Sequence, residues 1–453
     1  MNRFLYFLPL ALCPLTAQTE DAKSVCMAAL DALKAAQSDD LTPVVKAVMD
    51  ATGGDERAYW RLMKEAADAG HPVALTWLSG QSLRQLYAMG EDVQSASAAV
   101  NLRAAMEVAA KSGYVPALVE MAHFCGSGVG APADEKKGMQ YLMEACKANS
   151  LRARAAYLLL SGRLEKDGAA DAAVAAELKK NNFYVEEILA SLSARADEAK
   201  SREWLTTAAS HGSGAAACTL AQSYLAQGKE ALGIDFLKLA MERGHAESMA
   251  VMASLMLPGA DLSPALQSII QADEEAAIRL FRQAALLGYS PALIPLAGEY
   301  HKQKEKYAAE RVFELYRRAA DLGDPRGGVA YAYCLAAGRG CAPDAERGLR
   351  ILNQLVDAGI PFANMALADL YFNGTGVPAD MTKAISSLSA AASAGVPQCY
   401  TLMAVLAHLG NASRPADPMR AKVYLRMAEE RGEFTPGQGF DELVKSGGWK
   451  FIP

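Results

Sequence analysis

Cysteine and histidine, the residues that most often serve as nucleophiles or metal ligands, are spread along this sequence without a recognisable chemical motif. No two cysteines form a C-x-x-C pair, which is the spacing typical of zinc ligands and dithiol redox centres. No two histidines have the H-E-x-x-H spacing of zinc proteases. We therefore predict no metal site and no cofactor. The cysteines that follow Cys13 are Cys26, Cys125, Cys146, Cys218, Cys334, Cys341 and Cys399, and the histidines are His71, His123, His211, His245, His301 and His408.

Motifs for serine catalysis are also missing from the sequence, since neither G-x-S-x-G nor S-x-x-K occurs. Residues 374–379 spell GTGVPA, which superficially matches a dinucleotide-binding loop. That fingerprint requires a preceding strand, whereas a helical pattern precedes this segment and the loop repeats elsewhere. We therefore predict no catalytic residues and a protein that is not an enzyme.

The composition describes a long, folded, mildly acidic chain. Its 453 residues are too many for one compact core, so several domains or a repeat array are expected. A hydrophobic fraction of 51% excludes global disorder. The net charge is −6 without a basic cluster, which argues against nucleic acid as a partner. Beyond the first 17 residues no apolar run is long enough for a membrane span.

Residues 1–17 have the features of a secretion signal. Arg3 gives the positive start, an apolar stretch follows, and Ala17 before Gln18 is a plausible cleavage point. A buried N-terminal helix is the alternative, but Pro9 and Pro14 would each remove a helix hydrogen bond. We expect a cleaved signal peptide and a periplasmic or secreted protein.

Lipoprotein anchoring through Cys13 is a second form of export. The residue before an acylated cysteine is normally small, whereas the residue before Cys13 is the bulky Leu12, which argues against acylation. Cleavage near Gln18 is therefore the preferred prediction.

A recurring helix end organises most of the chain. The segments at residues 284–288, 319–323 and 391–395 share the pattern Ala-Ala-x-x-Gly. Further copies, not all with both alanines, end at a glycine or at an asparagine, the usual substitute for glycine at a left-handed helix terminus. These further copies end at Gly70, Gly113, Asn149, Asn181, Gly212, Gly244, Gly359 and Gly432.

A second landmark follows each of these helix ends before Gly432 at one fixed offset. It is a large apolar residue, usually followed by alanine, and the alanine lets two helices approach closely. We expect each repeat to be a pair of antiparallel helices, A and B, with this pair of residues on helix A. The anchors are Leu78-Ser79, Met121-Ala122, Tyr157-Leu158, Leu189-Ala190, Leu220-Ala221, Met252-Ala253, Leu296-Ala297, Tyr331-Ala332, Leu367-Ala368 and Met403-Ala404.

Three units carry a fuller signature between their two helices. Glycine loops begin at Gly126, Gly338 and Gly374, and each is followed by an aspartate. The aspartates are placed to cap the start of helix B. They are Asp134, Asp344 and Asp380.

Together these landmarks resemble the Sel1-like repeat, a tetratricopeptide-related family with the pattern L-A-x-x-Y-x-x-G-x-G-V-x-x-D-x-x-K-A…A-A-x-x-G. Residues 367–395 match it best, and the resemblance covers about residues 56 to 432. The unit around Asn181 lacks the glycine loop, and the units opening near Pro72 and at Glu247 have lengthened connections. The resemblance implies an all-α fold, an α/α superhelical solenoid of about ten helix pairs.

The resemblance also implies a class of function. Members of the family act as adaptors, and bacterial members often work in the cell envelope. We therefore expect a non-enzymatic protein-binding scaffold with a protein or peptide partner. The alternative is a peptidoglycan- or peptide-binding protein with weak hydrolase activity, for which cell-wall material would be the partner. A cysteine-rich branch is associated with wall binding, but this chain lacks its regular cysteine pairing.

By analogy with related helix-pair repeats, two positions on each helix A should face the concave side. Tyr333, Asp369 and Phe372 would then form an aromatic and acidic group suited to a basic or amide-bearing peptide. In the alternative interpretation, the two rings pack between neighbouring helices. The full set of candidate binding residues is His123, Gln222, His301, Tyr333, Asp369, Phe372 and His408.

The remaining predictions concern one disulfide and the two flanks. Cys334 on a helix A and Cys341 in the following loop are the candidate disulfide. Residues 18–55 are expected to form an N-terminal helical cap for the solenoid at residues 56–432. Residues 433–453 are expected to be a C-terminal cap, or else a tail with an aromatic docking end.

Overall fold

The computed structural model of the chain describes residues 17–88, 93–164, 171–435 and 439–446. Helices make up 73% of these residues, and no strand occurs among them apart from one isolated bridge between Asn411 and Arg414. The predicted all-α repeat fold is confirmed. The chain divides into two compact units, Met1–Ala292 and Leu293–Pro453.

The first unit contains α1 (Ala17–Ala36), α2 (Thr42–Thr52), α3 (Glu56–Asp68), α4 (Pro72–Ala88), α5 (Ser97–Lys111), α6 (Val115–Ser127), α7 (Glu135–Lys147), α8 (Leu151–Leu160), α9 (Ala172–Leu178), α10 (Phe183–Ser193), α11 (Glu198–Ser210), α12 (Gly214–Ala226), α13 (Glu230–Glu242), α14 (Ala246–Met256), α15 (Pro264–Ile269), α16 (Glu274–Leu286) and η2 (Ser290–Ala292). The second unit contains α17 (Leu293–Lys302), α18 (Ala309–Asp321), α19 (Pro325–Ala337), α20 (Ala345–Asp357), α21 (Phe362–Asn373), α22 (Met381–Ser393), α23 (Cys399–Leu409), α24 (Pro418–Glu430) and α25 (Phe440–Ser446).

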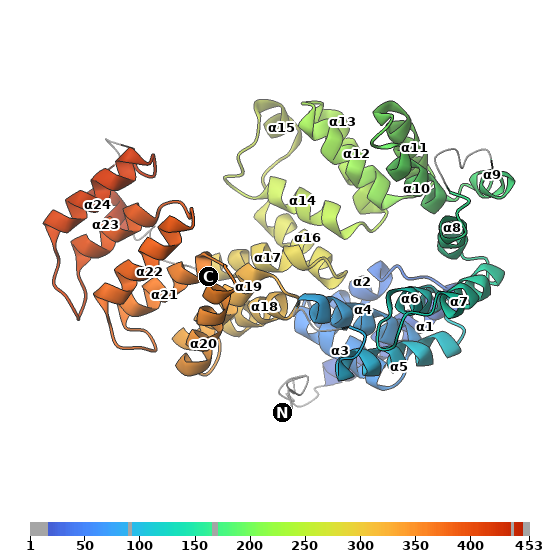
Figure 1. Cartoon of the computed structure of the whole chain (residues 1–453), viewed down its shortest axis with the longest axis horizontal. Helices are drawn as coiled ribbons and strands as arrows, with labels where there is room; N and C mark the ends of the chain where they lie inside the picture. Colours follow the sequence, from blue (N-terminus) through green and yellow to red (C-terminus); the bar gives the residue numbers. More distant parts are fainter. Residues whose placement is uncertain (1–16, 89–92, 165–170, 436–438, 447–453) are drawn as a thin grey trace. The chain divides into compact units, whose positions relative to one another are not determined.

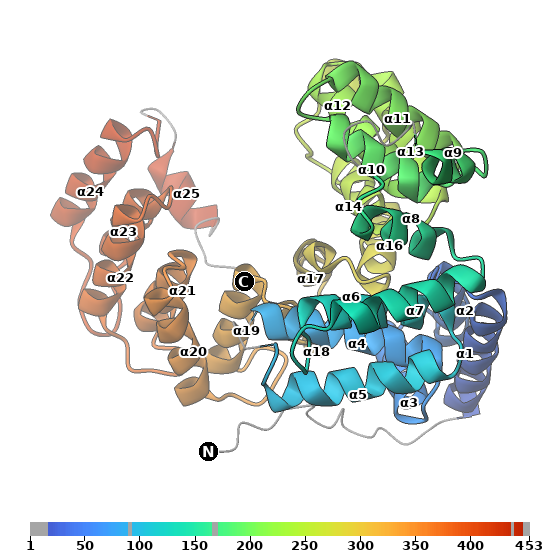
Figure 2. The same cartoon turned by 45° about the vertical axis from the view of Figure 1, so that its right-hand side comes forward.

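Consecutive helices pack as hairpins in the register that the sequence predicts. The helix A of each pair contains one anchor, and the following helix B ends at one of the predicted glycines or asparagines. Figures 1 and 2 both show α23 and α24 side by side as one such pair. The pairs are α4–α5, α6–α7, α8–α9, α10–α11, α12–α13, α14–α16, α17–α18, α19–α20, α21–α22 and α23–α24.

Two departures from the pattern also appear where the sequence weakens. The short helix α15 is inserted between α14 and α16, in the unit with a lengthened connection at Glu247. Helix α9, which ends before Asn181, has only 7 residues. A helix this short buries little apolar surface, which explains why its unit is the most degenerate.

The predicted helix ends all have the left-handed backbone that favours glycine or asparagine. The values of φ at these positions run from 55° at Asn181 to 111° at Gly212. A side chain with a Cβ atom rarely adopts this conformation, which is why the repeat keeps glycine or asparagine there.

Capping by aspartate begins helix B, as the sequence predicts. The side chain of Asp134 accepts a hydrogen bond from the backbone N–H of Lys137. Asp344 caps α20 in the same way, and Asp380 caps α22. These bonds satisfy backbone donors that would otherwise lack a partner at the helix start.

The glycine loop of the first full unit is displaced by two residues from the alignment that the sequence suggested. Helix α6 ends at Gly128, which has φ of 71°, just as α19 ends at Gly338 and α21 at Gly374. Gly128 and Gly130 are therefore the structural equivalents, and the alignment that began at Gly126 was wrong. The sequence Gly126-Ser127-Gly128-Val129 resembles the start of the glycine loop, but helix α6 continues through Ser127.

Close packing between the two helices of a pair requires small residues on both. The alanines of the anchors are buried. Opposite them, the fourth residue of helix B is small in most units. A Cβ atom on Gly348 of α20 would lie 2.6 Å from the carbonyl oxygen of Ala332 on α19, closer than real Cβ contacts.

Long-range contacts tie the N-terminal segment to later repeats of the first unit. Tyr114 donates a hydrogen bond to the carbonyl oxygen of Ser38 at 2.6 Å. The buried Glu56 lies 3.7 Å from the guanidinium of Arg282. A Cβ atom on Gly244 would lie 2.9 Å from the hydroxyl of Thr42, so the turn before α14 also approaches this segment closely.

The two termini of the chain are described only in part. Residues 1–16, which hold most of the predicted signal peptide, lie outside the described residues. At the C-terminal end the ring of Phe440 stands edge-on to the rings of His408 and Phe434. This part of the tail therefore packs on the last helix pair, whereas Trp449 and Phe451 lie outside the described residues.

Candidate functional site

A cavity of about 300 Å³ lies among α4, α6, α8 and the loop between α1 and α2, and we call it the unit 1 cavity. This volume is at the lower end of the range for small-ligand sites. Its lining combines aromatic, charged and amide side chains. They are Asp39, Leu41, Val73, Thr76, Trp77, Gly80, Gln81, Leu83, Arg84, Met106, Tyr114, Pro116, Glu120, His123, Phe124, Arg152 and Leu287.

Aromatic rings form part of the cavity wall. Trp77 is half-buried and stands edge-on to Tyr59 at 6.1 Å between ring centroids. Phe124 is buried, and so is Tyr114, whose hydroxyl is held by Ser38. Rings fixed in this way lose little rotamer freedom when they contact a ligand.

The two arginines that line the cavity differ in their ion-pair partners. Arg152 pairs with Glu120 at 2.8 Å and with Asp39 at 3.6 Å. Burial lowers the pKa of Arg152, but these two carboxylates outweigh it, so the net effect is to raise the pKa. Arg84 is exposed to solvent and forms no ion pair with any described residue. Partial burial of the guanidinium against the protein lowers the pKa of Arg84, although the carboxylate of Glu120 acts in the opposite direction.

A buried amide completes the cavity lining. Gln81 is only 7% exposed, and its side-chain oxygen has no hydrogen-bond partner among the described residues. Its amide nitrogen would lie 3.0 Å from a Cβ atom on Gly288, so the side chain is closely confined. An unsatisfied buried acceptor is unusual in a folded protein, and one beside a cavity can be satisfied by a ligand that donates a hydrogen bond.

The predicted binding residues fall in several places. Within the first unit, His123 is exposed and lines the unit 1 cavity, where its Nδ1 lies 3.3 Å from the hydroxyl of Ser127. Gln222 is exposed on α12 and donates a hydrogen bond to Glu247 at 2.9 Å. These two residues belong to separate sites.

The structure brings Tyr333 and Asp369 together, but inside the helix packing. Tyr333 is 1% exposed, and its hydroxyl donates a hydrogen bond to Asp369 Oδ2 at 2.5 Å. Phe372 is 7% exposed and packs with Ala368 and Met403. This arrangement corresponds to the alternative in which both rings are core. Little of either ring is exposed for contact with a ligand.

The other two predicted histidines are half-buried in the second unit. Burial lowers the pKa of His301 on α17, and the charges of Arg339 and Lys304 lower it further. His408 on α23 contacts the ring of Phe440.

The structure does not form the candidate disulfide between Cys334 and Cys341. Cys334 is buried on α19, and burial raises the pKa of its thiol to about 12. Cys341 Sγ instead lies 3.6 Å from the backbone carbonyl oxygen of Cys334. The loop therefore reaches back to the helix through the Cys341 thiol, which donates to a backbone oxygen of α19, and the two thiols are not bonded to each other.

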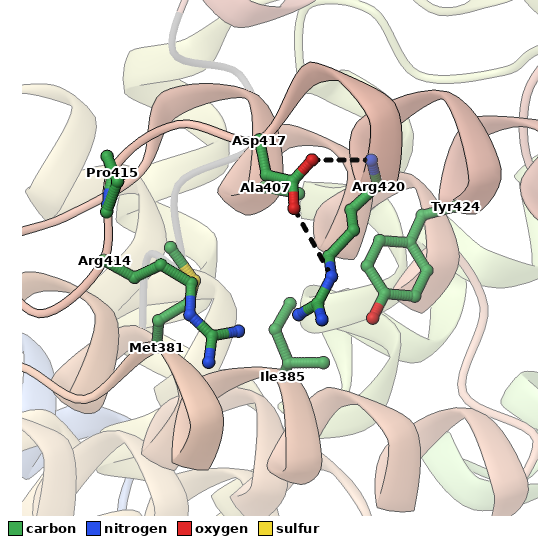
Figure 3. Close-up of a pocket in the computed structure, with 8 residues that line it drawn as sticks. All are labelled: Met381, Ile385, Ala407, Arg414, Pro415, Asp417, Arg420 and Tyr424. Carbon is green, nitrogen blue, oxygen red and sulfur yellow. Dashed lines mark hydrogen bonds and ion pairs between the residues drawn. The ribbon is translucent and has the colours of Figure 1, made fainter.

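A small pocket in the second unit is bordered by Arg414, Asp417, Arg420 and Tyr424 (Figure 3). Asp417 caps α24 and pairs with the guanidinium of Arg420 at 3.4 Å. The free volume is about 10 Å³, enough for about one water molecule. This pocket is too small for a ligand.

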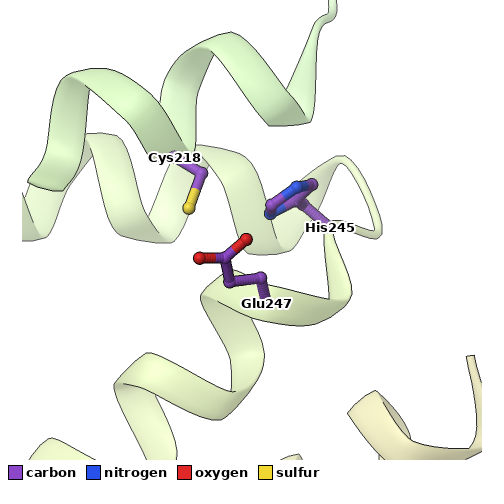
Figure 4. Close-up of side chains that lie close together, drawn as sticks. All are labelled: Cys218, His245 and Glu247. Atoms are coloured by element: carbon purple, nitrogen blue, oxygen red, sulfur yellow. The ribbon is translucent and has the colours of Figure 1, made fainter. Parts of the chain in front are cut away.

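Cys218, His245 and Glu247 form a cluster that the sequence analysis missed. One ligand atom from each lies within 4.8 Å of the other two, and the three side chains converge in Figure 4. Cys218 comes from α12, whereas the other two come from the start of α14. The sequence contains the short pattern His245-x-Glu247, but no local rule connects it to a cysteine 27 residues earlier.

The sequence matches the Sel1 repeat pattern in seven segments, at residues 115–150, 191–213, 246–289, 313–324, 329–359, 361–396 and 397–433. No curated protein matches the sequence. Among the described residues, no helix combines the length and the apolar character needed to cross a membrane.

Several solved structures are similar at low sequence identity. One is c5321, a protective antigen of uropathogenic Escherichia coli with an SLR fold, at 17% identity, TM-score 0.44, and 95% of this chain against 97% of that one. Another is a Sel1 repeat protein from Oxalobacter formigenes, at 18% identity, TM-score 0.42, and 54% against 99%. A third is the immunity protein Pa5087 from Pseudomonas aeruginosa, at 12% identity, TM-score 0.34, and 47% against 84%.

The repeat matches, the capped helix pairs and the glycine-ended helices agree with one another along the described chain. The chain belongs to the Sel1 repeat family, whose members are generally scaffolds for protein–protein interaction.

Proposed function

We propose that this chain is a non-enzymatic protein-binding scaffold, exported to the bacterial periplasm or secreted, and that its first unit binds an acidic peptide segment of the partner in the unit 1 cavity. The observation that carries the proposal is Gln81, whose buried side-chain oxygen has no hydrogen-bond partner beside this cavity. A backbone N–H of a bound peptide supplies the missing donor.

The charges favour an acidic segment. Arg152 already has two carboxylate partners, whereas Arg84 has none within ion-pair distance among the described residues. A carboxylate on the ligand would therefore pair with Arg84. Guanidinium–carboxylate hydrogen bonds are stronger than neutral ones and fix the orientation of the bound group.

The rings favour a peptide over a free inorganic anion. Trp77, Phe124 and Tyr114 give the cavity an apolar wall, which a small hydrated anion would not use. A short peptide would bury apolar atoms against these rings while its carboxylate reaches Arg84.

The test uses pooled fluorescent tetrapeptides with one Asp or Glu, and a matched pool with Asn or Gln. Fluorescence anisotropy should show tighter binding of the acidic pool. Arg84→Glu should weaken binding roughly tenfold or more, the scale of one lost charge-assisted hydrogen bond. Gln81→Leu should also weaken it, because the amide acceptor is lost.

Arg279→Glu is the matched control, since Arg279 is exposed on α16 of the same unit and does not line the cavity. Equal binding of the two pools, or an equal loss in the control, would refute the proposed site. Purified peptidoglycan, tested in parallel, separates a peptide partner from cell-wall material. Binding of peptidoglycan alone would support the wall-binding alternative.

A further inference from the structure

The turn that precedes α14 lies against the start of α12. A Cβ atom on Gly214, the first residue of α12, would lie 3.0 Å from the Cβ atom of His245, the residue just before α14. Glycine at this position therefore permits the approach of this turn to α12. This approach brings the thiol of Cys218, on the next turn of α12, to the side chains that begin α14.

We propose that Cys218, His245 and Glu247 bind one Zn²⁺ ion and thereby link two consecutive repeats of the first unit. Thiolate, imidazole and carboxylate are the three ligand types that zinc prefers in proteins. Calcium and magnesium prefer all-oxygen sites, so the cysteine and the histidine argue against them.

The geometry requires only a small adjustment. Zinc–ligand bonds of about 2.0–2.3 Å place tetrahedral ligand atoms roughly 3.5 Å apart. The three atoms here already lie within 4.8 Å of one another, so side-chain rotation suffices. Three protein ligands leave the fourth position to a water molecule.

Neighbouring side chains hold the ligands in place. Gln222 donates to Glu247 Oε1 at 2.9 Å and lies 3.8 Å from Cys218 Sγ. The hydroxyl of the buried Ser248 lies 2.9 Å from Nδ1 of His245. Such outer contacts orient metal ligands and are commonly part of a functional site.

The charges and protons of the proposed site balance. Zinc binds the thiolate form of cysteine, so binding of Zn²⁺ displaces the proton of the Cys218 thiol and releases one H⁺ to solvent. The thiolate and the carboxylate then neutralise the two charges of the ion. His245 and Glu247 are only half-buried, so the ion can enter from solvent.

The test begins with the full chain freed of metal by a chelator and kept reduced. Cobalt(II) serves as the probe, because a cobalt–thiolate bond gives a charge-transfer band in the near ultraviolet. We expect saturation at one cobalt per chain and displacement of cobalt by zinc. Zinc should also raise the melting temperature, because it binds only the folded state.

Three variants give the proposal its specificity. Cys218→Ser should abolish the band, and Glu247→Gln, at a half-exposed position, should weaken cobalt binding by about tenfold or more. Cys399→Ser removes another buried thiol, in the second unit, and should leave the band unchanged.

Absence of a band in the wild type, or its persistence in Cys218→Ser, would overturn the proposal. So would an equal loss in Cys399→Ser, since the binding would then depend on thiols in general. If Cys218→Ser does not fold, Glu247→Gln decides the question alone, and unchanged affinity in that variant counts against the site.

Discussion

At the scale of single residues, the Tyr333–Asp369 hydrogen bond shows how one repeat is joined to the next. The two side chains are 36 residues apart in sequence and both are buried. Tyr333→Phe removes the hydrogen bond while keeping the ring. We expect the free energy of unfolding to fall by about 1–3 kcal/mol in urea titrations, because a buried charged acceptor loses a donor. An unchanged midpoint would mean that solvent already reaches Asp369.

The double variant Tyr333→Ala with Phe372→Ala separates the two interpretations of these rings. Truncating a buried aromatic residue typically costs about 3–5 kcal/mol. We therefore expect a large fall in melting temperature, measured by circular dichroism. If partner capture were lost while the melting temperature stayed unchanged, the rings would belong to a binding face, as the sequence first suggested.

Within the helices of the second unit, replacing glycine by alanine should change the stability in opposite directions at two positions. Gly348→Ala would place a Cβ atom 2.6 Å from the Ala332 oxygen, so α20 would have to move away from α19. We expect a loss of about 1–3 kcal/mol from this overpacking, measured by chemical denaturation.

Gly298→Ala is the matched control on α17, because a Cβ atom there has no neighbour within 4 Å. Alanine is the better helix former by about 1 kcal/mol, so this variant should be slightly more stable than the wild type. Equal effects at the two positions would show that helix propensity, rather than the packing of helix A on helix B, governs the response.

The local rules of the repeat were predictable from the sequence, whereas the candidate sites were not, apart from His123 in the lining of the unit 1 cavity. Gly395 and Asp380 act within a few residues of their own position, so their roles as helix end and cap follow from the pattern. Gln81 and Arg84 lie in a unit that departs from the repeat, and their importance depends on neighbours far along the chain. The pairing of Cys218 with the start of α14 depends on the distance between two helices, which no spacing rule specifies.

For the protein as a whole, the first prediction is export from the cytoplasm. We expect the mature protein to begin near Gln18, because the preceding residues have the features of a cleaved secretion signal. N-terminal sequencing of protein recovered from the periplasm or medium of its host measures this directly. Protein that retains Met1 and stays in the cytoplasm would rule out export.

The contacts of the N-terminal segment distinguish the first unit from a simple stack of repeats. In most solenoids each repeat contacts only its neighbours, so unfolding can begin at any point. Here the carbonyl oxygen of Ser38 accepts a hydrogen bond from Tyr114. Glu56 forms an ion pair with Arg282, which lies near the end of the unit. We expect the first unit to unfold in one cooperative step in calorimetry, and Glu56→Gln should lower its transition temperature.

The same contacts constrain the order of events during synthesis. Arg282 leaves the ribosome about 230 residues after Glu56, which at about 5–20 residues per second is a delay on the order of 10 to 50 seconds. During that interval the carboxylate of Glu56 has no guanidinium partner from α16, and the early helices remain incompletely buried. A nascent chain in this state is a suitable substrate for chaperones, and one that has not yet closed on itself can still be threaded through a translocation channel.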